Sequence, residues 1–505
     1  MHRVVLLGLV FAAGPLSAQT ASPAGHAAAT ITADDVAHHI GIIADDSMLG
    51  RDTPSRGLEL TARYVAGRFS RSGLRPAGDG GTWFQRYPIT RRKFDAAASR
   101  VALRAGAVEA VARFDRTAIY VQGTASGKPL TGAAVLLGGR LAPDEVSRLP
   151  LRGRIVVYVP DSTARPSRHA PQVGRAIRLA APKAVVLVSN LAPGRFAARI
   201  PGSMSARTTV DLQLASPPFV EVSEAAVAPV LRAAGVDLRA VRADTTPVFR
   251  ELPGLRVTAE LRDSVLQSVT APNTVGILEG SDPELRHEYL VYSAHMDHIG
   301  ISPGRPDSVN NGADDDASGT TGVVELAEAF SRPGARPRRS IIFLTVSGEE
   351  KGLWGSRYFT EHPPVPIDRI VADLNIDMIG RNWRDTIVAI GREHSDLGAT
   401  LARVNHAHPE LGMTAIDDPW PEERFYFRSD HYNFARKGVP ILFFFNGVHP
   451  DYHQVTDSPD KIDSEKEARI LRLLYYLGRE IGDAPARPRW DPASYREIVD
   501  PPEGD

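Results

Sequence analysis

Short apolar runs alternate with amphipathic stretches between residues 256 and 482, and this alternation limits the possible folds more than any other feature of the sequence. Such runs suit strands that are buried on both faces, and apolar residues at three- and four-residue spacing suit the helices that cover them. The alternation predicts an α/β fold with a mixed, mostly parallel central sheet flanked by helices. The expected strands are residues 290–294, 341–346, 370–376 and 441–445, and the expected helices are residues 320–332, 353–362 and 464–481.

A different pattern occupies residues 97–252, where short β-rich runs lie between turns that contain Pro and Gly. This pattern predicts a small β-rich domain. We expect it to be inserted between an N-terminal helical part of the larger domain, at residues 30–96, and the α/β part at residues 253–484. Residues 485–505 are rich in Pro, Asp and Glu and are expected to form a C-terminal tail on the surface.

The first residues have the pattern of an export signal. Residues 1–18 combine a basic start, a short apolar stretch and a small residue, Ala18, where cleavage would fall. The apolar stretch is too short to cross a bilayer comfortably, although an uncleaved N-terminal anchor remains an alternative. We expect an exported protein, periplasmic or extracellular, with a flexible segment at residues 19–29 and no membrane span after the signal is removed.

An amphipathic helix is expected to begin after Thr32, because Thr32 is a suitable cap and acidic residues fill the first turn. His38 and His39 lie on this helix, and we expect both on the surface. Three further histidines, His298, His431 and His449, are expected near the site described below, either in contact with its ligands or in loop packing.

Composition excludes several kinds of site and partner. The chain has 505 residues and no cysteine, so any metal ion must be held by His, Asp and Glu. The 59 Lys and Arg residues balance 60 Asp and Glu residues, and a net charge of -1 gives no electrostatic basis for binding nucleic acid. The length exceeds that of one ordinary core, so two or more compact units are expected. The sequence leaves the oligomeric state open.

The metal-capable residues of the α/β part follow its predicted strands. In open α/β sheets, ligands bind at the carboxyl ends of the strands, so these side chains are expected at one edge of the sheet. A set of two histidines and several carboxylates, without sulfur, suits zinc. The residues are His295, Asp297, Asp315, Glu349, Glu350, Asp377 and His453.

This set is large enough for two ions if one carboxylate bridges them. Two ions about 3.5–4 Å apart can polarise a carbonyl group and hold a shared hydroxide. A neighbouring carboxylate that binds neither ion can take the proton of the attacking water. Glu349 and Glu350 fit this division, because successive residues beyond a strand end point in different directions.

Several separate motifs resemble peptidase family M28, a family of zinc peptidases. The motifs are AHMDHIG, NGADDDASG, SGEEKGLWGS, NIDMIG, RSDHYNFARKGVP and DYHQVTDSPDKID. The resemblance covers residues 256–482 and the N-terminal helices with their turn at Leu49–Arg51, and it implies a zinc-peptidase phosphorylase/hydrolase-like fold. Residues 97–252 resemble a protease-associated (PA) domain through their β-rich pattern and the segment LRGRIVVYV.

The resemblance implies a role for each site residue. Asp315 would bridge two zinc ions, and the peptide that follows it is expected to be cis. Glu349 would be the general base and later the acid. The two zinc sites implied for each chain are His295, Asp315 and Asp377 for one ion, and Asp315, Glu350 and His453 for the other.

Three more residues complete the implied catalytic set. The Asp297 carboxylate would hydrogen-bond a ring nitrogen of His295 and fix its tautomer. The Tyr452 hydroxyl would donate to the oxyanion formed when the carbonyl is attacked. Arg428 is a further candidate for that oxyanion or for a substrate carboxylate.

These observations predict an exported di-zinc aminopeptidase that acts on peptides. A carboxypeptidase or dipeptidase of the same family is an alternative, in which Arg428, Arg424 or Arg381 would hold the terminal carboxylate. A glutaminyl cyclase is a second alternative, although it needs only one zinc. A binding ectodomain without catalytic activity is a third, although it would have lost metal ligands that this chain retains.

Overall fold

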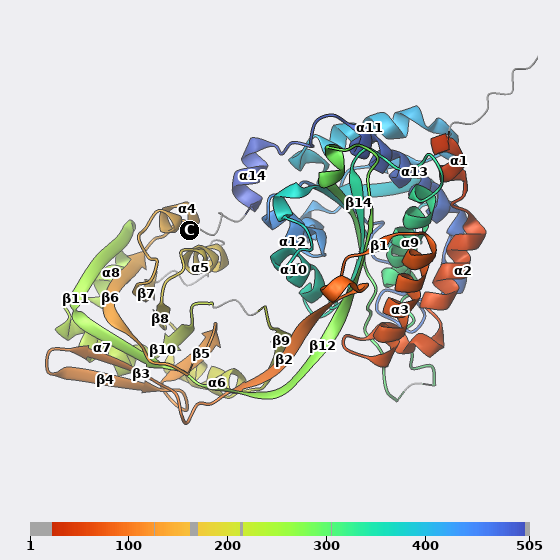
Figure 1. Cartoon of the computed structure of the whole chain (residues 1–505). Coiled ribbons are helices and arrows are strands. Elements are labelled where there is room, and N and C mark those ends of the chain that lie inside the picture. The colour runs from red at the N-terminus through yellow and green to blue at the C-terminus, as the bar shows by residue number, and fades with distance from the viewer. Residues whose placement is uncertain (1–22, 126, 162–169, 213–215, 305, 500–505) are drawn as a thin grey trace, which may run out of the picture.

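The computed structural model describes residues 23–125, 127–161, 170–212, 216–304 and 306–499, which form two sheets joined by long strands (Figure 1). The predicted signal peptide lies outside the described residues. Among the helices of these residues, none has both the length and the apolar content needed to cross a membrane.

The larger sheet is mixed, as predicted, and its four central strands are parallel. These strands are β14 (Ser340–Val346), β13 (Tyr289–His295), β15 (Ile370–Ile376) and β18 (Ile441–Phe444), and they match the four expected runs. Their side chains are buried on both faces, which explains the continuous apolar sequence. The outer strands are β12 (Asp263–Leu278), β2 (Phe84–Phe94) and β9 (Arg207–Val210) on one side and β16 (Thr386–Ile390) and β17 (Thr414–Ile416) on the other, and β1 (Arg75–Pro76) pairs with β12.

Helices cover both faces of this sheet and form an apolar core on each (Figure 1). At the centre of one core, the rings of Tyr292 and Phe343 stack with 5.8 Å between their centroids. One face carries α1 (Pro23–Ala29), α2 (Ala33–Ile43), α3 (Arg56–Arg71), α9 (Gly319–Phe330), α11 (Leu397–Ala407) and α13 (Ser464–Asp483), and the other carries α10 (Trp354–Glu361), α12 (His431–Arg436) and α14 (Pro492–Ile498).

The N-terminal helices begin at residues that satisfy their free N–H groups. The side chain of Thr32 accepts from the Asp35 N–H at 3.1 Å, which confirms the predicted cap of α2. Ser55 accepts from the Leu58 N–H at the start of α3 in the same way. The prediction of a flexible segment at residues 19–29 is wrong for Pro23–Ala29. These residues form helix α1, in which two alanines are buried. Alanine is the strongest helix former, so an Ala-rich stretch readily becomes helical once it can pack.

The smaller unit is an eight-stranded sheet with its own apolar cores. Its strands β6, β7, β8 and β10 are parallel, with antiparallel strands on both sides. The strands are β3 (Arg100–Ala105), β4 (Val108–Arg113), β5 (Ala118–Gln122), β6 (Leu130–Gly139), β7 (Ile155–Pro160), β8 (Ala184–Val188), β10 (Phe219–Val222) and β11 (Pro247–Glu260). Its helices are α4 (Pro143–Ser147), α5 (Ala170–Leu179), α6 (Pro193–Ser203), α7 (Glu224–Ala233) and α8 (Leu238–Ala243).

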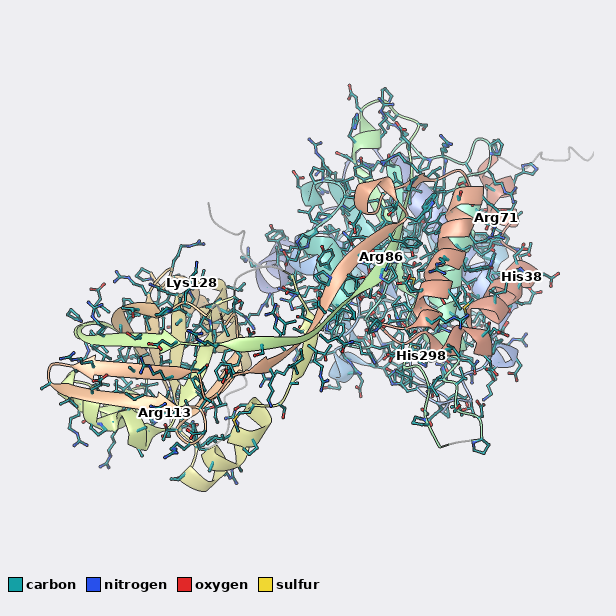
Figure 2. The ribbon with its side chains drawn as sticks, turned by 60° about the horizontal axis from the view of Figure 1, so that its bottom comes forward. His38, Arg71, Arg86, Arg113, Lys128 and His298 are labelled. Atoms are coloured by element: carbon teal, nitrogen blue, oxygen red, sulfur yellow. The ribbon has the colours of Figure 1, made fainter. Side chains whose placement is uncertain are left out.

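The predicted boundary between residues 252 and 253 falls inside a strand. The register of β11 shifts between Leu252 and Arg256, and the strand then continues to Glu260. The Pro253-Gly254 pair therefore marks a bulge and not the end of the unit. The long strands β2 and β12 pair with each other and connect the two sheets, and Arg86 on β2 lies in the larger unit, far from Arg113 in the smaller one (Figure 2). The resemblance of the smaller unit to a PA domain remains a prediction.

Candidate metal centre

The carboxyl ends of three parallel strands bring the predicted metal-capable residues to one edge of the larger sheet. His295 is the last residue of β13 and pairs with Val346, the last residue of β14. Asp377 directly follows β15, and Glu349 and Glu350 follow β14 after a short turn. The position of each side chain therefore follows from where its strand ends, as the sequence pattern predicts.

His295 forms one group with two carboxylates. Its Nε2 atom lies 3.3 Å from Asp315 Oδ1 and 3.6 Å from Asp377 Oδ1. All three residues are buried. Two ligands of one tetrahedral zinc ion lie about 3.4 Å apart, so these separations suit a shared ion.

His453 forms a second group on the other side of Asp315. Its Nε2 atom lies 3.1 Å from Asp315 Oδ2 and 3.2 Å from Glu350 Oε2. Asp315 therefore presents one carboxylate oxygen to each group. A carboxylate in this position can bridge two ions.

The two groups satisfy a chemical test for metal binding. Asp315 Oδ2, Asp377 Oδ1 and His453 Nε2 are buried atoms that lack a hydrogen-bond partner within the described residues. Each ring nitrogen faces two carboxylates, and one N–H can serve only one of them well. Unpaired buried polar atoms are rare and costly, and a cation would satisfy all three. The nitrogen and oxygen donors suit zinc.

The three successive aspartates have different partners. Asp314 Oδ1 accepts the Gly380 N–H at 2.6 Å. Asp316 accepts main-chain N–H groups of His295, Gly319 and Met378. The Asp315 side chain makes no main-chain hydrogen bond among the described residues and faces the histidines. The Asp315-Asp316 peptide is cis, as expected.

Glu349 belongs to neither group. Its side chain lines the cavity beside them, and its main-chain N–H donates to Asp297 Oδ1 at 3.2 Å. Desolvation by the surrounding protein raises the pKa of Glu349 well above its usual value. A carboxylate that faces the cavity without binding an ion is suited to exchanging protons there.

The predicted contact between Asp297 and His295 needs a correction. His295 Nδ1 donates to the main-chain oxygen of Asp297 at 3.2 Å, whereas the Asp297 carboxylate lies 3.7 Å from that nitrogen. The carboxylate instead accepts from the Thr53 hydroxyl at 2.9 Å and from the Glu349 N–H. Asp297 thus orients the His295 ring with its carbonyl and the Glu349 backbone with its carboxylate.

Tyr452 and Arg428 both line the same cavity. The Tyr452 ring stacks on His453 with 3.8 Å between the centroids, and burial raises the pKa of its hydroxyl. Arg428 is exposed, donates to Glu423 Oε2 at 3.1 Å and covers the Phe425 ring at 4.7 Å.

Two chemically distinct sets of residues line the cavity, whose volume is about 430 Å³ including open solvent. One set contains the metal-capable residues His295, Asp315 and Asp377 together with Glu349. The other set is apolar and consists of Met378, Phe425, Phe443, Phe445 and Val448.

Arg51 has a role that the sequence did not reveal. Its guanidinium is fully buried and donates to four main-chain oxygens, including Met296 O at 3.0 Å and Gly312 O at 2.8 Å. These oxygens lie beside His295 and just before the three aspartates, so Arg51 fixes both ligand-bearing loops. The resemblance at Leu49–Arg51 was the only signal, and it gave no role.

Two other positioning residues were also missed. Asp457 accepts the N–H groups of Asp314 and Asp315, at 3.1 Å and 3.2 Å respectively. The Ser429 hydroxyl donates to Asp377 Oδ2 at 3.0 Å. Both contacts join segments far apart in the chain, so no local pattern could predict them.

The remaining histidines differ in their surroundings. His39 was expected on the surface but is 2% exposed, because its ring lies against Tyr64 of α3 and Glu325 of α9. His298 is fully buried beside Glu350. His431 lies 2.8 Å from the Tyr426 carbonyl, and burial lowers its pKa to about 3. His449 Nε2 lies 3.2 Å from Asp314 Oδ2.

Comparisons with known proteins give the following findings. The family model described as peptidase family M28 matches residues 273–478. Aminopeptidase YwaD of Bacillus subtilis is 25% identical over 217 residues, which are 41% of this chain and 44% of that protein. A probable zinc metalloprotease of Pyrenophora tritici-repentis is 33% identical over 263 residues, which are 44% of this chain and 53% of that protein. The chain spans about half the length of these curated relatives.

Among solved structures, an aminopeptidase from Aneurinibacillus sp. strain AM-1 aligns with 92% of this chain and 98% of its own. The sequence identity is 17% and the TM-score is 0.46.

Proposed function

Because the chain carries a peptidase family M28 domain over residues 273–478, we propose that it is a zinc-dependent aminopeptidase that removes N-terminal residues from peptides. One observation carries this proposal. Two groups of metal-capable side chains share Asp315, which lines a cavity, and Glu349 lines the same cavity without joining either group.

We infer two zinc ions per chain. His295, Asp315 and Asp377 would hold one, and Asp315, Glu350 and His453 would hold the other. When bound, such ions polarise the scissile carbonyl and lower the pKa of water. The division of the two Asp315 oxygens between the groups supports the count of two.

Glu349 is the proposed general base. It would take a proton from the attacking water and later give it to the leaving amine. Asp297 fixes the backbone of Glu349 with its carboxylate and the His295 ring with its main-chain oxygen. The Tyr452 hydroxyl is the proposed donor to the oxyanion, since its side chain lines the same cavity.

The acidic and apolar residues that line the cavity support a free N-terminus with an apolar side chain as the substrate end. A cationic α-amine would lie against the carboxylates of Glu349 and Asp377, and the side chain would contact the apolar lining residues. Two of the three cations considered for a carboxypeptidase already have acidic partners, and the third, Arg424, covers the Phe427 ring at 4.8 Å. Arg381 lies 2.9 Å from Asp451, and Arg428 lies 3.1 Å from Glu423.

We also propose that the protein acts outside the cytoplasm. The support is the sequence of residues 1–18 alone, which has the pattern of an export signal.

The test is product analysis by mass spectrometry on one peptide with an apolar first residue. The peptide is offered free, N-acetylated and C-amidated, with zinc or with a chelator. The proposal predicts loss of the first residue from the free and amidated forms, no cleavage of the acetylated form, and no cleavage with chelator. The exposed substitution His38→Ala is the matched control and should behave as the wild type.

The other outcomes identify the alternatives. Cleavage that survives acetylation and fails with amidation would indicate a carboxypeptidase. Loss of ammonia from a peptide that begins with Gln, without shortening, would indicate a glutaminyl cyclase. No reaction of any form with zinc supplied would contradict the enzymatic proposal.

A further inference from the structure

We propose that His298 is a positioning residue for the second metal ion: its Nδ1–H group holds one oxygen of Glu350 so that the other oxygen is left to bind the ion. This inference rests on the proposed di-zinc function. It assigns a role to a histidine that belongs to neither predicted set of ligands, although its ring lies within the second group of metal-capable side chains.

The contacts of Glu350 carry the inference. His298 Nδ1 lies 2.9 Å from Glu350 Oε1, which is an ordinary hydrogen-bond length. His453 Nε2 lies 3.2 Å from the other oxygen, Oε2. The two histidines therefore contact opposite oxygens of one carboxylate. Their rings meet edge to face with 5.6 Å between centroids.

The surroundings of His298 fix the direction of its ring. The side chain is fully buried, and its main-chain N–H donates to the Arg51 carbonyl at 3.3 Å. The ring packs against Gly312, where an added Cβ would lie 2.6 Å from His298 Cγ. Gly312 has a left-handed backbone with φ of 56°, so a side chain there would be both strained and obstructed. Nδ1 is thereby held toward Glu350.

The tautomer distinguishes a positioning role from direct metal binding. If Nδ1 bound an ion, the proton would reside on Nε2, and Nε2 is buried without a hydrogen-bond partner among the described residues. A buried N–H without an acceptor is strongly disfavoured. With the proton on Nδ1, the donor is satisfied by Glu350 and only a lone pair remains at Nε2. His298 Nδ1 is also 3.6 Å from Asp315 Oδ2, too far for a hydrogen bond there.

Removal of the contact between His298 and Glu350 should lower the affinity for the second ion more than the affinity for the first. Without His298, the Glu350 carboxylate can turn, and its binding geometry is no longer fixed. Loss of a partner that orients a metal ligand weakens metal affinity by roughly 10–100-fold. The ion held by His295 and Asp377 does not contact Glu350, so its affinity should change by less than about threefold.

The test is zinc titration of the full chain against a competing chelating dye, with wild type, His298→Ala and His298→Asn. The amide of Asn can place an N–H donor near the position of Nδ1 but is a poor zinc ligand. We expect two ions in the wild type, a second ion bound 10–100-fold more weakly in H298A, and affinities within about threefold of wild type in H298N. Cobalt absorption spectra of the three proteins should show the same order. Circular dichroism of the metal-free proteins checks that each is folded, and His38→Ala is the control.

Each contrary result has its own meaning. If H298A binds both ions as tightly as the wild type, His298 does not position Glu350 and the inference is overturned. If H298N is as weak as H298A, a lost ligand explains the data and the positioning role is overturned. If the folded wild type binds fewer than two ions, the proposed metal centre itself fails, and this inference fails with it.

Discussion

Within the residues that the structure describes, two clusters that could surround an ion contain His and Glu, and they differ in how their charges are balanced. The metal centre lies at the edge of the larger sheet. The helix-layer cluster lies between α2, α3 and α9. It consists of His39, Tyr64, Arg68, Glu325 and Glu328. Both clusters place possible ligand atoms close enough to surround an ion.

The helix-layer cluster also has a buried atom without a hydrogen-bond partner among the described residues, Glu325 Oε1, but a proton can satisfy this atom without an ion. Arg68 donates to Glu328 at 2.6 Å, and His39 lies 2.5 Å from the Tyr64 hydroxyl and 3.2 Å from Glu325. Burial lowers the pKa of His39 to about 4 and raises that of Glu325 to about 8. Near neutral pH, a protonated Glu325 can therefore donate to an unprotonated His39.

The metal centre has no comparable balance. Within the described part of the chain, the ion-pair partners of Asp315, Asp377 and Glu350 are histidines, with no Lys or Arg among them. Each predicted ligand histidine faces two carboxylates. The comparison teaches that residue type alone does not identify a metal site. The balance of donors, acceptors and charge separates the two clusters.

The largest effect is expected from a substitution of Asp315, the residue that both groups of the metal centre share. Asp315→Asn should lower bound zinc from two ions to less than one per chain, because both groups lose a ligand. Peptidase activity should fall by at least about 10³-fold. Zinc content by elemental mass spectrometry and initial rates check this. Glu325→Gln in the helix-layer cluster is the matched control and should keep both ions. Two ions in D315N would contradict the bridging role.

The next effect separates catalysis from metal binding. Glu349→Gln should lower turnover by roughly 10²–10⁴-fold while both zinc ions remain, because the side chain loses its ability to take a proton. The rate and the zinc content are measured on the same preparation. Turnover close to wild type would remove Glu349 from the mechanism.

A third prediction concerns the pH dependence of stability in the helix-layer cluster. The pKa of Glu325 is raised from 4.5 to about 8 in the folded protein, so its stabilising contribution is lost as the pH rises through this range. His39, lowered from 6.5, has the opposite effect only below that pH. Within this cluster only the Glu325 effect remains above pH 6.5, and it should lower the free energy of unfolding by up to about 1.4 kcal/mol per pH unit until about pH 8.

Chemical denaturation at pH 6.5 and pH 8, with chelator present, measures this slope. In Glu325→Gln the group no longer titrates, so the variant should lose less stability than the wild type over the same interval. Equal losses in the two proteins would show that Glu325 is ionised in the folded state at both pH values.

The smallest effect is expected from a substitution at the start of α2, the helix that carries His39. It tests whether the helix-layer cluster and the metal centre are independent. Thr32→Ala removes the cap of α2 and should lower the free energy of unfolding by about 1 kcal/mol. Zinc affinity should not change, because the cap lies outside the metal centre. A change in zinc affinity would show that the two regions are coupled.

The sequence predicted the central strands and the residues at their ends for one physical reason. A strand buried on both faces must be apolar throughout, so its end is visible where a polar residue such as His295 or Asp377 appears. The topology of parallel strands then brings these residues to one edge.

Other features depend on partners far along the chain. His39 lies on the same side of α2 as Val36 and Ile43, so the helical spacing placed it inside, but its polarity suggested the surface. Its acidic partner, Glu325, is on α9. The buried Arg51 and the continuation of β11 beyond Leu252 likewise depend on distant backbone, which a local pattern does not contain.

The most direct test of the two-ion metal centre is an anomalous difference map from crystals of the full chain grown with zinc, with data collected at the zinc absorption edge. The account predicts two peaks about 3.5–4 Å apart on either side of Asp315, one beside His295 and Asp377 and one beside Glu350 and His453. It predicts no peak between His39 and Glu325. A single peak at the sheet edge, or zinc in the helix-layer cluster with none at Asp315, would contradict it.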